Sequence, residues 1–187
     1  MPQPTPRWVW WVAGTGLGLL LLRILGKPAV IQGLLVSYAG KIPRGGQYKF
    51  LRADGRVHKG IDVFAPEGTA VAAAERGRVE YSGIIQGFGE VVVVDHPQFG
   101  VRSLYAHLSK RYVAVGQEVA QNDLVGAVGR TANDPDGCGR YFCSSAPHLH
   151  FEVITDAGPI NRSRSRTSPL AWLADVGMAP YAAPAVA

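Results

Sequence analysis

Two short segments of the chain contain residue types that bind metal ions, at spacings that suit a metal site. In HKGID, Asp62 follows His58 by four residues, and in HLH a single leucine separates His148 from His150. Side chains two residues apart in a strand project from the same face. We therefore expect His148 and His150 to point together. If HKGID is extended, His58 and Asp62 also share one face.

Histidine and aspartate are ligand types that zinc takes in catalytic sites, where three protein ligands leave one position for water. Gly60 lies between His58 and Asp62 and has no side chain to stand between them. A site built from these two residues and one later histidine contains one negative charge, so it stays positive with a divalent cation. Such a site lowers the pKa of a bound water. The residues predict one zinc ion, and their spacing leaves the third ligand open.

The two remaining histidines have different settings. His107 lies in LYAHL, which is typical of a strand, whereas His96 lies in the turn-like segment VDHPQFG. We interpret His96 as an ordinary surface or hydrogen-bonded core histidine. The coincidence of HxxxD, HxH and a further strand histidine in one small β-domain favours a metal site over chance occurrence.

The elements that must position these residues are predicted to be short strands. From residue 58 to residue 154, short apolar runs recur about every ten residues between turns, without sustained helical periodicity. This pattern predicts a mainly β fold with a small antiparallel sheet, sandwich or barrel. A short helix is expected at residues 168–177, with Ser168 as cap and Pro169 at its first position. The predicted strands are 68–74, 77–83, 89–96, 101–108, 112–119, 123–129 and 148–154, and 89–108 is expected to form a hairpin.

The N-terminus differs from the rest of the chain. Residues 8–22 are uncharged and almost wholly apolar, with three tryptophans at one end. These features favour an N-terminal apolar helix that anchors the chain in a membrane. A cleaved signal peptide and a buried helix are the alternatives. Either an anchor or a signal peptide places the rest of the chain outside the cytoplasm. We expect it in the periplasm or cell envelope, anchored in the inner membrane, with secretion after signal cleavage as the alternative.

Cys138 and Cys143 are the only cysteines, and they lie in the loop-forming segment DPDGCGRYFCSSAP. Two cysteines at this spacing can close a small disulfide ring in an oxidising compartment. Two free thiols are the alternative. A zinc site at this pair would need two more ligands nearby, and none is evident in the sequence.

The segments HKGIDVFAPEGTAV, YAHLS and PHLHFEV, in this order, resemble the motifs of the LytM/lysostaphin-type (M23) zinc metallopeptidases. The resemblance runs from about Val57 to Ile154. It implies a small, mainly antiparallel β fold with a groove over the sheet. It also implies hydrolysis of peptide bonds in the stem peptides or cross-links of bacterial peptidoglycan. On this basis we divide the chain into an anchor or signal segment (1–27), a lead-in (28–56), the peptidase-like domain (57–155), and a basic loop, short helix and tail (156–187).

The resemblance also implies roles for individual residues. His58 and Asp62 match the first two zinc ligands of the family, and His150 matches the third. His148 and His107 match two catalytic histidines that do not bind the metal. One of these two accepts a proton from the attacking water and stabilises the tetrahedral intermediate, and the sequence does not decide which.

Three features lie outside these motifs. Glu152 shares a strand face with His150 and is either a partner of the site or a solvated carboxylate. The loop INRSRSRTS either grips anionic wall polymer or is simply a solvated basic loop. Residues 129–147 form a longer loop than the family usually has before HxH, and we expect this insertion to line the groove.

Other functions are less favoured by the sequence. A non-cleaving LytM-like module that binds or activates other wall hydrolases is the principal alternative, but all five matching positions are present. Glycine-rich segments also resemble halves of biotinyl or lipoyl carrier domains. A carrier needs an exposed lysine at a hairpin tip, and no lysine occurs between Lys59 and Lys110. The net charge of +5 favours anionic polymers, yet no interleaved basic and aromatic motif is present, so we predict no nucleic-acid partner.

Overall fold

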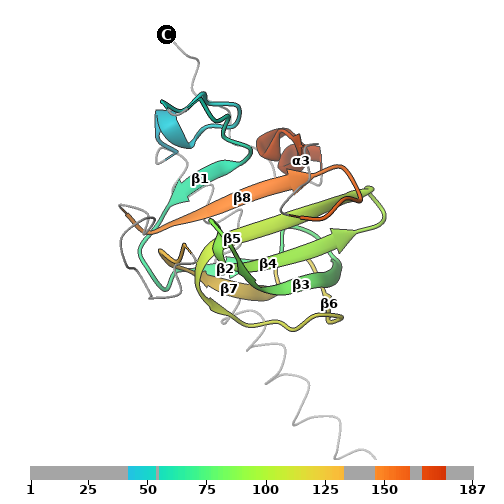
Figure 1. The fold of residues 1–187 in the computed structure, drawn as a ribbon. Helices are drawn as coiled ribbons and strands as arrows, with labels where there is room; N and C mark the ends of the chain where they lie inside the picture. Colours follow the sequence, from blue (N-terminus) through green and yellow to red (C-terminus); the bar gives the residue numbers. More distant parts are fainter. Residues whose placement is uncertain (1–41, 54, 133–145, 161–165, 176–187) are drawn as a thin grey trace, which may run out of the picture.

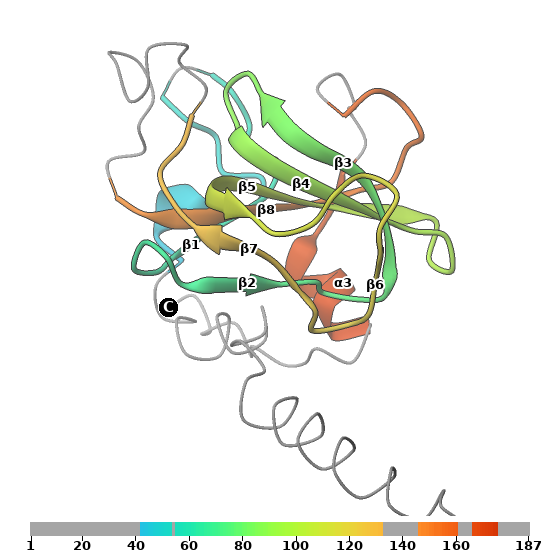
Figure 2. The ribbon, with the colours of Figure 1, turned by 90° about the horizontal axis from the view of Figure 1, so that it is seen from below.

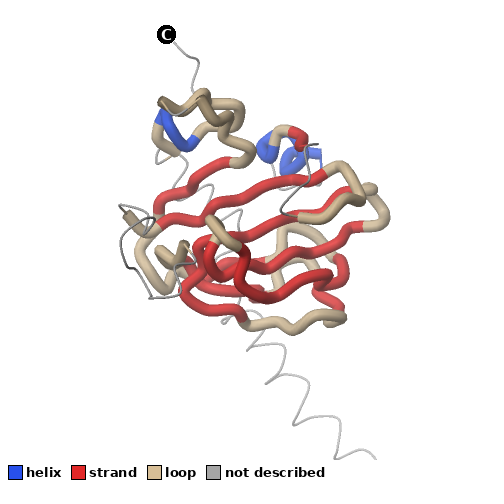
Figure 3. The backbone as a smooth tube through the Cα atoms, viewed as in Figure 1, coloured by secondary structure: helices blue, strands red, loops and turns tan. Residues whose placement is uncertain are grey.

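The computed structural model describes residues 42–53, 55–132, 146–160 and 166–175 (Figure 1). Apart from the short 3-10 turn η2 (Arg44–Gly46) and helix α3 (Pro169–Asp175), the regular elements of the described chain are strands (Figure 3). The predicted N-terminal helix and the cysteine pair Cys138 and Cys143 lie outside the described residues. The strands are β1 (Ile61–Phe64), β2 (Ala70–Ala72), β3 (Gly77–Ile85), β4 (Gly89–His96), β5 (Val101–Arg111), β6 (Glu118–Val119), β7 (Leu124–Val128), β8 (His148–Ile154) and β9 (Arg166–Thr167).

Every strand pair is antiparallel, and all nine strands belong to one connected sheet. The main path runs β1-β8-β5-β4-β3-β6. Strand β7 pairs with β2 and with the last part of β5, which sets β2 and β7 off from the plane of β8, β5 and β4 (Figures 1 and 2). The prediction of a mainly β, antiparallel fold is confirmed, including the β4–β5 hairpin.

Strand β8 separates two environments. Its residues Leu149, Phe151 and Val153 belong to the main apolar core, which also takes residues from β1, β2, β4, β5, β7 and α3. The alternate residues His148, His150 and Glu152 project from the opposite face, as expected for a strand. All seven residues of β8 are buried. The strand therefore places three polar side chains, already shielded from water, on the face away from the core.

One predicted strand is wrong. The segment 112–119 is a loop except for β6 at its end. The chain turns at Gly116, whose φ of +86° suits glycine, and the Gly116 N–H donates to the Val79 carbonyl. The apolar residues of this segment therefore alternate in sequence without forming one continuous ladder.

The predicted C-terminal helix is confirmed as α3. Pro169 is its first residue, and Ser168 Oγ accepts a hydrogen bond from the Ala171 N–H at 3.4 Å. Trp172 and Leu173 are buried in the main core, so the helix covers one edge of the β structure. In the part of the chain that the structure describes, no helix has both the length and the apolarity to cross a membrane.

Candidate active site

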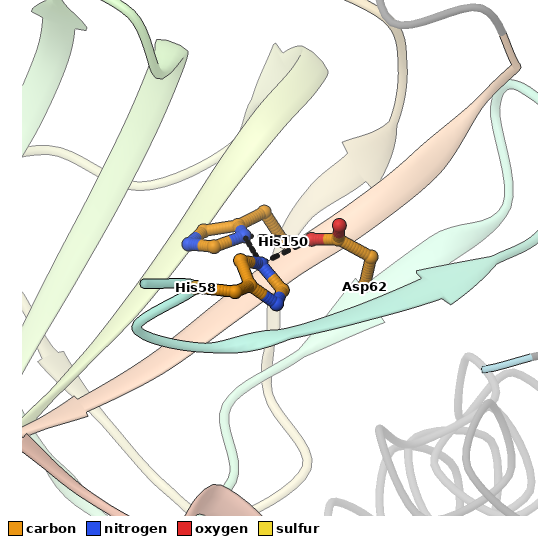
Figure 4. A group of neighbouring side chains, drawn as sticks. All are labelled: His58, Asp62 and His150. Carbon is orange, nitrogen blue, oxygen red and sulfur yellow. Dashed lines mark hydrogen bonds and ion pairs between the residues drawn. The ribbon is translucent and has the colours of Figure 1, made fainter. Parts of the chain in front are cut away.

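Three of the predicted residues converge at one position, which we call the metal point (Figure 4). Oδ1 of Asp62 lies 2.7 Å from His150 Nδ1 and 3.1 Å from His58 Nε2, and the two histidine nitrogens are 3.1 Å apart. Ligands about 2.0 Å from a tetrahedral zinc ion lie about 3.3 Å from one another. The three atoms are therefore spaced as ligands of one small metal ion.

The second nitrogen of each ring shows which atoms face the metal point. His58 Nδ1 donates to the Gln47 carbonyl at 2.9 Å, and His150 Nε2 donates to Glu152 Oε1 at 3.0 Å. Because a carbonyl and a carboxylate only accept, these nitrogens bear the ring protons. His58 Nε2 and His150 Nδ1 then direct lone pairs at each other and at Asp62. Three acceptors this close need a positive charge between them, which is either a proton on His150 Nδ1 or a metal ion, and the three ligand types fit a metal ion.

The fold brings these residues together by strand pairing and by one close backbone contact. Asp62 on β1 lies directly opposite His150 on β8. His58 precedes β1, and its N–H donates to the Phe50 carbonyl at 2.8 Å. A Cβ on Gly60 would lie 2.4 Å from the backbone oxygen of residue 151. Gly60 therefore does more than leave space between two ligands, because it allows β8 to approach the HKGID backbone.

Charges around the metal point favour a cation. Burial raises the pKa of Asp62, but hydrogen bonds with His150 and His58 outweigh it and hold this pKa far below its usual range. Burial lowers the pKa of His150, but hydrogen bonds and the negative charges of Asp62 and Glu152 raise it to about 9. A proton on His150 Nδ1 and a metal ion therefore compete for the same position.

Glu152 is a buried partner of the site and is not a solvated carboxylate. The residue is 1% exposed, and its two oxygens accept from His150 Nε2 at 3.0 Å and from Arg166 Nε at 2.5 Å. Burial raises its pKa, but the bond to His150 and the charge of Arg166 lower it to about 2. The Arg166 side chain is 4% exposed, so neither sequence interpretation of the basic loop holds for this arginine.

The two other predicted histidines lie beside the metal point. The rings of His107 and His148 are 4.7 Å apart between centroids, and His148 Nε2 is 3.6 Å from Asp62 Oδ1. His107 Nδ1 donates to the Thr131 carbonyl at 2.7 Å, and His148 Nδ1 donates to the Ala146 carbonyl at 3.1 Å. Each ring therefore has Nε2 as its proton-accepting atom.

Burial keeps both of these rings neutral at neutral pH. Burial, with the positive charge of His150 and the charge that His148 would carry if protonated, lowers the pKa of His107 to about 3. Burial is also the main cause of the lowered pKa of His148, against the opposing charge of Asp62. A neutral imidazole can accept a proton from a reacting group. The site thus combines a cation-binding cluster with two proton acceptors.

A β-bulge holds His107 in its orientation. The register of β4 and β5 shifts between Glu90 and Val92, and His107 has a φ of +60°, which is uncommon for a residue with a Cβ. Thr131 bridges the interrupted ladder, because its Oγ1 accepts from the Glu90 N–H at 2.9 Å and donates to the Leu108 carbonyl at 2.7 Å. Sequence reasoning missed Thr131, whose partners lie far away along the chain.

His96 is a hydrogen-bonded core residue, which is one of the two settings expected for it, and it is not a surface residue. It is fully buried, and its ring nitrogens bond to the Arg76 carbonyl and to Ser103 Oγ, both at 2.8 Å. Its ring packs against Trp172, with centroids 5.3 Å apart.

A small antiparallel β domain with a His–Asp–His cluster and two adjacent neutral histidines has the features of a metallopeptidase. Comparison with known proteins gives the family: residues 56–162 match the model for peptidase family M23, and the chain belongs to this family. Its fold also matches the catalytic domain of the antimicrobial peptidase lysostaphin from Staphylococcus simulans. That match has a TM-score of 0.55 and 28% identity, and it covers 69% of this chain and 87% of the other.

Curated relatives include both peptidases and an activator. The DD-carboxypeptidase/endopeptidase Mpg of Neisseria meningitidis serogroup B is 38% identical over 106 residues, which are 57% of this chain and 22% of Mpg. The peptidoglycan DD-endopeptidase ShyC of Vibrio cholerae is 35% identical over 54% of this chain and 21% of its own length. The murein hydrolase activator EnvC of Escherichia coli is 36% identical over 62% of this chain and 23% of its own length. The chain thus matches less than a quarter of the length of each of these proteins.

Proposed function

We propose that this protein is a zinc-dependent endopeptidase that hydrolyses peptide bonds in the stem peptides or cross-links of bacterial peptidoglycan. The observation that carries this proposal is the convergence of His58, Asp62 and His150 on one point with their lone pairs facing it. Membership of family M23 and similarity to two proteins named as endopeptidases support the substrate class.

In the proposed mechanism, His58 Nε2, Asp62 Oδ1 and His150 Nδ1 hold the metal. A bound zinc ion supplies polarisation of the scissile carbonyl and a lowered pKa for a water. His107 and His148 are neutral. His148 Nε2 lies 3.6 Å from Asp62 Oδ1, and the His107 ring lies beside the rings of His148 and His150, with centroids 4.7 and 5.7 Å away. One of them accepts the proton of the attacking water at Nε2, and the imidazolium formed in this way then donates that Nε2–H to the developing oxyanion.

The substrate places the protein outside the cytoplasm, in the periplasm or cell envelope. The apolar segment within residues 1–27 is proposed to anchor it in a membrane, with cleavage of that segment as the alternative. The domain limits given above and the Cys138–Cys143 disulfide also stay predictions.

The test uses the purified full-length chain, loaded with zinc and incubated with purified peptidoglycan. Mass spectrometry of the released fragments should show new peptide termini that are absent for His150→Ala and after metal chelation. The masses of the new termini identify the bond that is cut.

The same experiment separates the enzyme from a non-cleaving module. A protein that binds one zinc ion tightly but releases no fragment from peptidoglycan refutes the endopeptidase. That result, together with a rise in the activity of an added wall hydrolase, would assign the protein to the activators, as EnvC is named.

A further inference from the structure

The basic loop after β8 contains one arginine that is part of the interior. Strand β9 pairs with the end of β8, with Arg166 opposite Ile154. Glu152 and Ile154 share a strand face, so Arg166 is diagonal to Glu152 and its long side chain reaches that carboxylate. The Tyr48 hydroxyl, from the lead-in, donates to the Arg166 carbonyl at 2.9 Å. The backbone of Arg166 is thus held on both sides.

A continuous line of hydrogen bonds joins this arginine to the metal point. Arg166 Nε donates to one oxygen of Glu152 at 2.5 Å, and His150 Nε2 donates to the other at 3.0 Å. His150 Nδ1 then faces Asp62 at 2.7 Å. Both side chains of the Arg166–Glu152 pair are almost completely shielded from water, with 4% and 2% exposure.

The physical role of Arg166 follows from this burial. A buried carboxylate is stable only when its charge is paired and its lone pairs are satisfied. Without the guanidinium, the Glu152 side chain keeps only the His150 ring as a charged partner among the described residues, and rotation toward water becomes favourable. The His150 ring then loses the acceptor that defines its tautomer and its orientation.

We propose that Arg166 is a positioning residue for the metal site. It holds Glu152 in place, and Glu152 in turn orients His150 with Nδ1 toward the metal point. This inference rests on the proposed function only in that it takes His150 as a metal ligand. It requires no knowledge of the bond that is cleaved.

The test measures the zinc dissociation constant of the full-length chain by competition with a chromogenic chelator. Loss of a residue that supports a metal-ligating histidine weakens metal binding by about 10- to 100-fold. We expect a loss of this size for Arg166→Gln. Arg166→Lys should lose less, because lysine keeps the charge but lacks the planar fork.

A matched control is Arg102→Gln. Arg102 is also a buried arginine in an ion pair, with Glu80 at 3.0 Å, and its side chain is 8% exposed. It lies on β5 opposite Ile154, whereas the β5 residue opposite His150 is Ala106, so Arg102 does not pair with the part of β8 that carries His150. Its replacement should lower stability without changing zinc affinity. A loss of zinc affinity in this control equal to that of Arg166→Gln would show a general effect of destabilisation and would overturn the inference.

A double-mutant cycle with Glu152→Gln tests the route of the effect. If Arg166 acts through Glu152, Arg166→Gln should change zinc affinity by less than about threefold in the Glu152→Gln background. An equal loss in both backgrounds, or wild-type affinity for Arg166→Gln, overturns the inference. If Arg166→Gln does not fold, the same cycle is run with Arg166→Lys.

The outcomes separate this inference from the proposed function. Zinc binding without cleavage of peptidoglycan refutes the endopeptidase and leaves the Arg166 comparison valid. Unchanged zinc binding in Arg166→Gln, with cleavage by the wild type, refutes the inference alone. Wild-type protein that binds no zinc overturns both.

Discussion

Substitution of Gly60 by alanine tests how closely the metal point depends on the approach of two backbone segments. The new Cβ would lie 2.4 Å from the Phe151 carbonyl oxygen, 2.9 Å from Glu152 Cγ and 3.0 Å from His150 Cε1. Side chains can adjust, but the carbonyl cannot move easily because β8 is paired with β1 on one side and β5 on the other. The HKGID segment must therefore move away from β8.

The size of this movement follows from the contact. Real Cβ atoms essentially never approach another heavy atom closer than 3.0 Å, so the segment must retreat by at least about 0.6 Å. Ligand distances in metal sites hold to within about 0.2 Å. Because His58 and Asp62 flank Gly60 and His150 lies on β8, the displacement opens the ligand set. We expect zinc binding to weaken about 10- to 100-fold and the free energy of unfolding to fall by about 1–3 kcal/mol.

Chelator competition gives the zinc affinity, and urea unfolding without metal gives the stability. Gly45→Ala is the matched control, because a Cβ there comes within 4 Å of one atom of the described residues, Phe50 Cε1 at 3.9 Å. Its zinc affinity and urea midpoint should equal those of the wild type. If Gly60→Ala also binds zinc like the wild type and unfolds at the same urea concentration, the proposed close packing of HKGID on β8 is wrong.

Two further predictions concern residues that flank the metal point and the core. Thr131→Val removes the hydroxyl that bridges the bulge at His107, so the catalytic rate constant should fall about tenfold or more. Zinc affinity should stay unchanged, and Thr131→Ser should retain activity. A drop in zinc affinity alone would contradict the role given to His107. Burial lowers the pKa of His96 below 6.5, so the folded state resists protonation of this ring. The contribution of His96 to the free energy of unfolding should therefore be complete above pH 6.5 and decline as the pH falls toward the folded pKa. In urea titrations across this pH range, His96→Gln should reduce the slope of stability against pH by up to about 1.4 kcal/mol per pH unit; an unchanged slope would show that His96 does not contribute.

The strand pattern was predictable where polar and apolar side chains alternate along one continuous ladder. The alternation in HLHFEVI correctly places His148, His150 and Glu152 on one face. The same reasoning failed for residues 112–119, because the left-handed turn at Gly116 interrupts the ladder while the apolar pattern continues. In that segment Val113 and Val119 are buried, but Val115 is 64% exposed, so an alternating apolar pattern by itself decides neither burial nor strand pairing.

The residues that hold the site histidines in place were not predictable from the spacing of residues along the sequence. Gln47 contributes a backbone carbonyl, which every residue type possesses, so no sequence pattern marks it. The Thr131 hydroxyl bonds to groups 23 and 41 residues away. Arg166 was expected either on the surface or against polymer, because a serine-rich basic loop has the composition of exposed chain.

The sequence by itself determined the metal-binding residue types, their spacing within two extended segments, and the mainly β class of the fold. These properties are local, since they depend on the alternation of side chains along a strand. Only the tertiary structure decided that His58 faces the metal point with Nε2 and His150 with Nδ1. The opposite nitrogen of each ring is held by an acceptor, Gln47 in the lead-in and Glu152 backed by Arg166, and which acceptor reaches which ring depends on how distant segments pack.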